Sequence, residues 1–146
     1  MPVKDFQNLT RKIKFISIHC SDSDYKHHDN VETLREWHVN GNGWSDVGYN
    51  AVVCKSKPAV RLARDINRTP AAVAGKNTGN FAICITGKHK FTKQQFKRCR
   101  ALIEHIYELL GYKVPVYPHK YFDNSRSCPN FDVKKELGLN KQYVLS

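Results

Sequence analysis

The sequence lacks any long apolar run, repeat or biased tract. No hydrophobic stretch approaches the roughly 20 residues of a membrane-spanning helix, and 8 Gly with 6 Pro among 146 residues are too few for a disordered or fibrous chain. The polar N-terminal segment, residues 1–6, also lacks the apolar core of a signal peptide. These absences predict one domain, residues 1–146, that has room for a core and is kept at first in the cytoplasm.

Cysteine is present but lacks the pattern of a disulfide framework. The count of five is odd, and no two cysteines form a CxxC pair. Three of them lie in apolar segments and are predicted to be core residues: Cys54, Cys84 and Cys99. The other two, Cys20 and Cys128, lie beside polar residues and are therefore candidates for chemistry.

Acidic residues are scarce. Against 13 Asp and Glu stand 24 Lys and Arg, which gives a net charge of +11. This excess predicts an anionic partner, either nucleic acid, anionic lipid or an acidic cell-wall polymer, and a soluble basic surface without a partner is the alternative. The basic segment 88–100 fits a nucleic-acid backbone less well than the charged outer face of an amphipathic helix.

Apolar segments with strand and helix periodicity alternate along the chain. Residues 14–20 alternate like a strand, and residues 81–87 are apolar throughout, as in a central strand. Three shorter segments are also predicted to be strands: 47–55, 59–64 and 114–117. Three segments are predicted to be helices: 31–39, 92–110 and 132–137. This interleaving predicts an α/β domain.

Capping signals set the predicted ends of two helices. Thr92 and Gln95 have the spacing of a capping box, and Gly111 is expected to end the same helix. Asp29 and Glu32 have the same spacing and predict a second capping box before residue 31.

Two histidines and one cysteine have the chemistry of metal ligands. His19 ends a predicted strand, His119 follows another, and Cys128 lies in a loop bounded by prolines. A catalytic zinc site has three such ligands and an open position for water. Two neutral imidazoles and one thiolate leave Zn²⁺ with a net charge of +1. The spacing from His119 to Cys128 matches no short zinc signature, however, so spacing alone favours solvated histidines and a buried thiol.

The remaining histidines favour other roles. His27 and His28 are adjacent in a polar loop and are expected to be solvated. His38 shares the apolar face of its helix, which favours a hydrogen-bonded histidine over a ligand. The sequence also has no glycine-rich phosphate loop and no serine in a nucleophile elbow.

Five segments in order resemble one family. They are FISIHCS, LREWHVNGNGWSDVGYN, ARD, FAICITG and PHKYFDNSRSCPNFD, and they span most of residues 14–132. Together they resemble the phage T7-lysozyme type of N-acetylmuramoyl-L-alanine amidase, a branch of the amidase and peptidoglycan-recognition fold. The resemblance implies a central mixed sheet flanked by helices, with zinc in a groove on one face.

The resemblance also implies roles for individual residues. His19, His119 and Cys128 fall on the family's zinc ligands, and Tyr49 falls on its catalytic tyrosine. The implied substrate-binding residues are Trp44, His38 and Lys120.

This sequence departs from the family pattern at the position where a lysine often precedes the ligand cysteine by two residues. Here the residue is Arg126, which stays charged and cannot donate a proton. One extra residue separates His119 from Cys128, so either Lys120 or Arg126 is expected to take the role. The segment 71–73, Ala-Ala-Val, also replaces a histidine that the family usually places in the groove.

The implied activity is hydrolysis of the amide between the lactyl group of N-acetylmuramic acid and L-alanine, by a monomeric phage-type endolysin that needs zinc. Its expected partners are peptidoglycan and the anionic bacterial envelope, which it would reach from the host cytoplasm at lysis. One alternative is a peptidoglycan-binding module of the same fold without catalysis. Another is a basic binding regulator, for example of a phage RNA polymerase.

Overall fold

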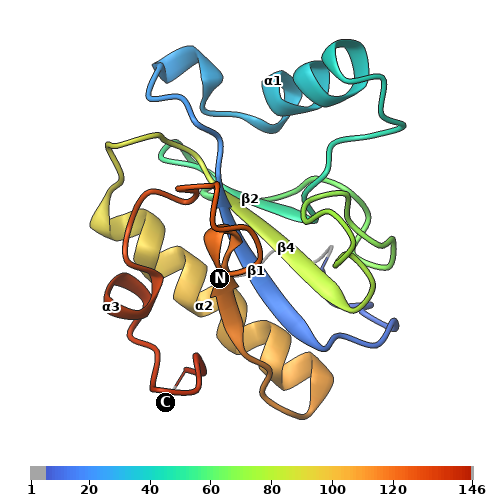
Figure 1. Ribbon diagram of the computed structural model, residues 1–146, viewed down its shortest axis with the longest axis vertical. Coiled ribbons are helices and arrows are strands. Elements are labelled where there is room, and N and C mark those ends of the chain that lie inside the picture. The colour runs from blue at the N-terminus through green and yellow to red at the C-terminus, as the bar shows by residue number, and fades with distance from the viewer. Residues whose placement is uncertain (1–5, 146) are drawn as a thin grey trace.

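Strand β1 (Phe15–Cys20) lies inside a five-stranded sheet of order β3-β2-β4-β1-β5 (Figure 1). In this computed structural model, β1 is parallel to β4 (Asn80–Ile85) and to β5 (Val116–Pro118), and β4 is parallel to β2 (Ala51–Val53). Only β3 (Val60–Leu62) is antiparallel to its neighbour, β2. The predicted mixed sheet is therefore confirmed.

The structure describes residues 6–145. Residues 1–5, on which most of the signal-peptide prediction rests, lie outside this range. None of the helices in the described part of the chain has the length and hydrophobicity that a membrane crossing requires.

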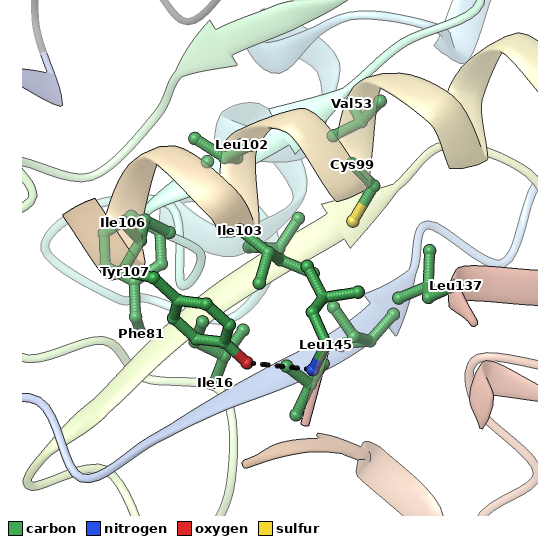
Figure 2. Packing of buried hydrophobic residues seen from close by; sticks show 14 of the residues in the cluster. Ile16, Val53, Phe81, Cys99, Leu102, Ile103, Ile106, Tyr107, Leu137 and Leu145 are labelled. Carbon is green, nitrogen blue, oxygen red and sulfur yellow. Dashed lines mark hydrogen bonds between the residues drawn. The ribbon is translucent and has the colours of Figure 1, made fainter. Parts of the chain in front are cut away.

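Helices flank the sheet on both faces. Helix α2 (Lys93–Leu110) contributes Leu102, Ile103 and Ile106 to the main core, where they pack with Ile16 (Figure 2). The short helix α3 (Val133–Leu137) joins the same core. On the other face, α1 (Val31–Glu36) packs on a smaller cluster of buried residues: Val31, Leu34, Val47, Val52, Cys54, Ala63 and Cys84.

The alternation along β1 separates apolar from polar side chains. Ile16 and Ile18 belong to the core beneath α2, so Ser17 and His19 point to the opposite face. Ser17 and His19 are nevertheless 0% and 1% exposed. The strand therefore places a buried polar pair on the face away from α2.

The predicted ends of α2 are confirmed. The amide of Gln95 donates to Thr92 Oγ1 over 3.1 Å, and the amide of Thr92 donates to Gln95 Oε1 over 3.0 Å. At the other end, Gly111 adopts φ 77°, a left-handed conformation that glycine takes at little energetic cost.

The predicted first residue of α1, Val31, is confirmed, but the predicted capping residue is wrong by one position. Asn30, not Asp29, caps the helix, because its extended backbone lets Oδ1 accept the amide of Thr33 over 2.7 Å. Asp29 instead accepts the amides of Lys55 and Ser56, each over 2.9 Å. After Glu36 the chain continues as a π-helical turn through Gly41 instead of an α-helix.

The predictions for the cysteines of the core are confirmed. Cys54, Cys84 and Cys99 are fully buried, and all five cysteines are free thiols. Cys20, a candidate for chemistry, is also buried, while Cys128 is partly exposed.

Candidate metal centre and active site

The three predicted ligands converge. His19 is near the carboxyl end of β1, and His119 directly follows β5, its parallel neighbour. Cys128 comes from the loop that follows. One ligand atom from each side chain lies within 4.8 Å of the others. Because parallel strands end at the same edge of a sheet, β1 and β5 bring together histidines that are 100 positions apart in sequence.

Backbone hydrogen bonds hold the loop that carries Cys128. The amide of Lys120 donates to the carbonyl oxygen of Cys128 over 3.0 Å, which closes the loop onto its own start. The amide of Asn130 donates to the carbonyl oxygen of Ser127 over 2.8 Å. The Cys128 sulfur accepts the backbone amide of Cys20 over 3.2 Å, so the thiol is attached to the end of β1.

Both histidines are held in their neutral form. Burial, followed by the charge of His119, holds the pKa of His19 well below its ordinary value. Burial and the nearby Arg126 guanidinium also lower the pKa of His119. Neutral imidazole is the form that binds metal ions, so neither ring must lose a proton first.

Cys128 favours the neutral thiol when no cation is bound. A hydrogen bond with the Cys20 thiol, together with burial, raises the pKa of Cys128 far above its ordinary value. A bound cation would reverse this preference because it stabilises the thiolate directly.

The cluster fits a tetrahedral metal ion. Ligands at about 2.0–2.3 Å from such an ion lie roughly 3.4–3.8 Å apart, so the present separations need only small side-chain adjustments. Two of the ligands also have an outer partner: Ser17 Oγ lies 2.7 Å from His19 Nε2, and the Cys20 amide donates to Cys128 Sγ. Such outer contacts orient metal ligands in proteins. Sequence reasoning missed Ser17, although its i, i+2 spacing from His19 on a strand was a usable signal.

Two pockets meet at this cluster, and His119 and Arg126 line both. The first, of about 470 Å³, is walled mainly by Trp44, Ala71, Ala72, Val73, Ala74 and Phe122. The second, of about 400 Å³, is more polar and includes Ser21, Asp22, Tyr49, Ser125, Ser127 and Asn130. An extended molecule can therefore pass the candidate ligands on two sides.

Tyr49 packs beside the cluster. Its ring centroid lies 5.2 Å from that of His19, and the residue lines the second pocket. Burial raises the pKa of Tyr49 well above its ordinary value, so the phenol keeps its proton. It can therefore donate a hydrogen bond into the pocket.

The residues predicted to bind substrate occupy different positions. Trp44 lines the first pocket. His38 packs against Trp44 and Tyr49, with ring centroids 4.7 and 5.4 Å away, and its Nδ1 accepts the amide of Gly48 over 2.8 Å. Lys120 is exposed and lines neither pocket. The geometry thus makes His38 a support for its neighbours and leaves only Trp44 facing a pocket.

Arg126 is better placed than Lys120 to act on a ligand between the pockets. Its side chain is 63% exposed, and Nε lies 3.5 Å from a carboxylate oxygen of Asp123. An ion pair this exposed is weak, so the guanidinium can turn toward a negatively charged group.

Comparisons with known proteins agree with this geometry. A family profile described as N-acetylmuramoyl-L-alanine amidase matches residues 9–131. No curated protein matches the chain.

Solved structures share its fold. The amidase LysC from Clostridium intestinale URNW is 22% identical with a TM-score of 0.74, over 88% of this chain and 85% of the other. The endolysin of Thermus scotoductus MAT2119 bacteriophage Ph2119 is 18% identical with a TM-score of 0.74, over 88% and 86%. The peptidoglycan recognition protein LE, in complex with a monomeric diaminopimelic acid-type peptidoglycan, is 19% identical with a TM-score of 0.71, over 83% and 76%.

A close backbone approach shapes the first pocket and yields a prediction. A Cβ at Gly48 would collide with the carbonyl oxygen of Ala71, whose amide donates to Gly48. We expect Gly48→Ala to displace the segment 71–74 and to lower the free energy of unfolding by about 1–3 kcal/mol, as overpacking does. Denaturant unfolding and the fluorescence of the adjacent Trp44 measure the two effects.

Gly41→Ala is the matched control, because nothing lies within 4 Å of a Cβ at that position. Equal stability of the two variants would contradict the importance of the contact.

Proposed function

We propose, on the premise that the chain belongs to the N-acetylmuramoyl-L-alanine amidase family, that it is a zinc-dependent peptidoglycan hydrolase. It cleaves the amide between the lactyl group of N-acetylmuramic acid and the L-alanine of the stem peptide. One observation carries the proposal: His19, His119 and Cys128 converge within 4.8 Å beside two open pockets.

Zinc matches this donor set. Two imidazoles and one thiolate are usual zinc ligands, and three protein ligands leave one position open, as in catalytic sites. When bound, the ion supplies a Lewis acid that polarises a carbonyl group and acidifies water. A single anionic ligand, Cys128, would leave the site a net charge of +1 for this purpose.

Tyr49 provides a proton-bearing group beside the ligands. Because its phenol stays protonated, we assign it the role of orienting the attacking water or passing a proton toward the leaving amine. Its position next to the ring of His19 and at the wall of the second pocket supports this role.

Arg126 provides positive charge for the developing oxyanion. Its guanidinium stays charged and offers five N–H donors, and it lines both pockets, where a carbonyl between them would lie. Since arginine cannot act as an acid, the proton for the leaving amine must come from another group, for which Tyr49 is the candidate.

The binding module of the same fold is the second candidate. The chain shares its fold with peptidoglycan recognition protein LE, whose structure holds a peptidoglycan fragment. A binding module needs the pockets but not the ligands, and here both histidines and Cys128 are present. The ligands therefore favour the enzyme.

The basic surface supports an additional attraction to anionic envelopes. Ion pairs to arginine occupy some of the carboxylates, among them Asp46, Glu104 and Asp123. The net charge of +11 already counts every carboxylate, so an excess of cations remains to attract an anionic surface.

The remaining expectations concern biology outside the site. Action on the wall at lysis, as by a phage endolysin, is part of the proposal. No contact among residues 6–145 bears on a phage RNA polymerase, so that association stays a prediction.

The amidase proposal predicts one pattern of products. Incubation with purified peptidoglycan and Zn²⁺ should release new L-alanine amino termini without new reducing sugars. A chelator should stop the release, and added Zn²⁺ should restore it. Binding to peptidoglycan without either product would instead establish the binding module.

Removal of one ligand tests the metal site. Cys128→Ser should abolish both the bound zinc and the amidase activity, because the thiolate is the only anionic ligand. Cys54→Ala is the control, since Cys54 is buried under α1 and apart from the ligands. Full activity of Cys128→Ser would contradict the assignment of Cys128 as a metal ligand.

The role of Arg126 is tested by turnover. We expect Arg126→Ala to lower kcat by about 100- to 1,000-fold, the usual effect of losing one oxyanion donor, and Arg126→Lys to retain part of the activity. The control is Lys97→Ala, which removes one positive charge from the exposed side of α2. Unchanged turnover in Arg126→Ala would assign the oxyanion role to another residue.

Electrostatic attraction predicts sensitivity to salt. Lytic activity on bacterial envelopes should fall as ionic strength rises through 0.1 M, where the screening length is about 10 Å. Hydrolysis of a small soluble muramoyl peptide should change much less. If both substrates respond equally, the surface charge does not guide the protein to the envelope.

A further inference from the structure

We propose that Ser17 is a positioning residue that selects which nitrogen of His19 binds the metal ion. Its hydroxyl engages Nε2 and thereby directs Nδ1 toward His119 and Cys128. The inference rests on the proposed function, since it assumes that this cluster binds zinc.

The contact is short and shielded from water. Ser17 Oγ lies 2.7 Å from His19 Nε2, and the two residues are 0% and 1% exposed. They stand two positions apart on β1, so both side chains emerge on the same face of the sheet. Water does not compete for a hydrogen bond buried to this extent, which makes its loss costly.

Packing alone cannot choose between the two nitrogens. The His19 ring is held between His119 and Tyr49, with ring centroids 4.7 and 5.2 Å away. A half-turn of the imidazole keeps nearly the same shape but exchanges a nitrogen with a carbon at each position. Before an ion binds, a hydrogen-bond partner is needed to distinguish the two orientations, and Ser17 is that partner at Nε2.

This orientation also decides which nitrogen of His19 carries the proton. A nitrogen bound to a metal ion has no proton, and a neutral imidazole carries one proton on the other nitrogen. With Nδ1 on the metal ion, Nε2–H donates to Ser17 Oγ. This tautomer is the one that the buried hydroxyl stabilises.

The hydroxyl is rigidly placed. Ser17 pairs in register with Ala82 of β4 and with Tyr117 of β5, so strands lie on both sides of it. A second Ser–His pair, Ser23 Oγ with His28 Nδ1 at 2.6 Å, lies at a short 3-10 turn away from the ligands. The chain therefore contains the same chemical pair in a position that serves no ligand.

A serine also preserves the charge of the site. A carboxylate in its place would orient the ring equally well but would add a negative charge next to the ligands. The neutral hydroxyl leaves Cys128 as the single anionic group of the set, so the bound ion keeps its power to polarise a carbonyl.

Metal affinity of the full chain tests the proposal. We expect Ser17→Ala to bind Zn²⁺ about 10- to 100-fold more weakly than the unaltered protein, measured by competition with a chromophoric chelator. The visible spectrum of the Co²⁺ form should also change, because the ligand field depends on ring orientation. Ser23→Ala should leave the Zn²⁺ affinity and the Co²⁺ spectrum unchanged, and Ser17→Thr, which keeps the hydroxyl, should retain most of the affinity.

A measurement on the unaltered protein covers the case in which Ser17→Ala does not fold. Nitrogen-15 NMR of the Zn²⁺ form should show a proton on His19 Nε2 and the metal ion on Nδ1. The reverse assignment, or unchanged Zn²⁺ affinity in a folded Ser17→Ala, would overturn the proposal. If the unaltered protein binds no Zn²⁺ at all, the proposed function itself fails.

Discussion

The position of β1 between β4 and β5, inside the sheet, is the constraint on which the rest of the structure depends. Its side chains alternate, so Ile16 and Ile18 enter the core beneath α2 while Ser17 and His19 face the other side. A shift of register by one residue would bury the histidine in the apolar core and expose the isoleucines to the site. Apolar burial under α2 therefore also fixes the direction of the first candidate ligand.

The same strand organises the other two ligands. The parallel pairing of β5 with β1 brings His119 to the edge of the sheet where β1 ends, close to His19. The Cys20 amide, in the last residue of β1, donates to the sulfur of Cys128 and so holds the following loop. The apolar core between α2 and the sheet stabilises the sheet. The sheet in turn positions His19, His119 and Cys128 close together.

The electrostatics of the site follow from its burial. Burial lowers the pKa values of His19 and His119 and raises that of Tyr49, while a hydrogen bond with Cys20 and burial raise the pKa of Cys128, so all four groups are neutral when no cation is bound. Among the described residues, His119 and Arg126 line both pockets, and of these two Arg126 is permanently charged. A bound cation and Arg126 would supply positive charge beside the ligands, which suits chemistry that develops negative charge on a carbonyl oxygen.

Local signals predicted most of the elements. The capping box of Thr92 and Gln95 and the glycine after α2 act within a few residues, and the structure confirms both. The predicted cap of α1 is wrong because the carboxylate of Asp29 accepts hydrogen bonds from the amides of Lys55 and Ser56. These partners are distant in sequence, so no local pattern reveals them. His38 was predicted from its helix face to be hydrogen-bonded, and the structure confirms this, although its partner, the amide of Gly48, comes from a later turn.

The sequence by itself determined the α/β class, both ends of α2, the three cysteines of the core and, through its resemblance to a family, the identity of the candidate ligands. Periodicity and capping are local, so they can be read along the chain. Only the tertiary structure decided that Arg126 and not Lys120 lines the pockets, and that Ser17 meets His19 Nε2. The first result depends on how the loop that carries Arg126 closes, and the second on the orientation of the His19 ring. Contacts with residues distant in sequence set both.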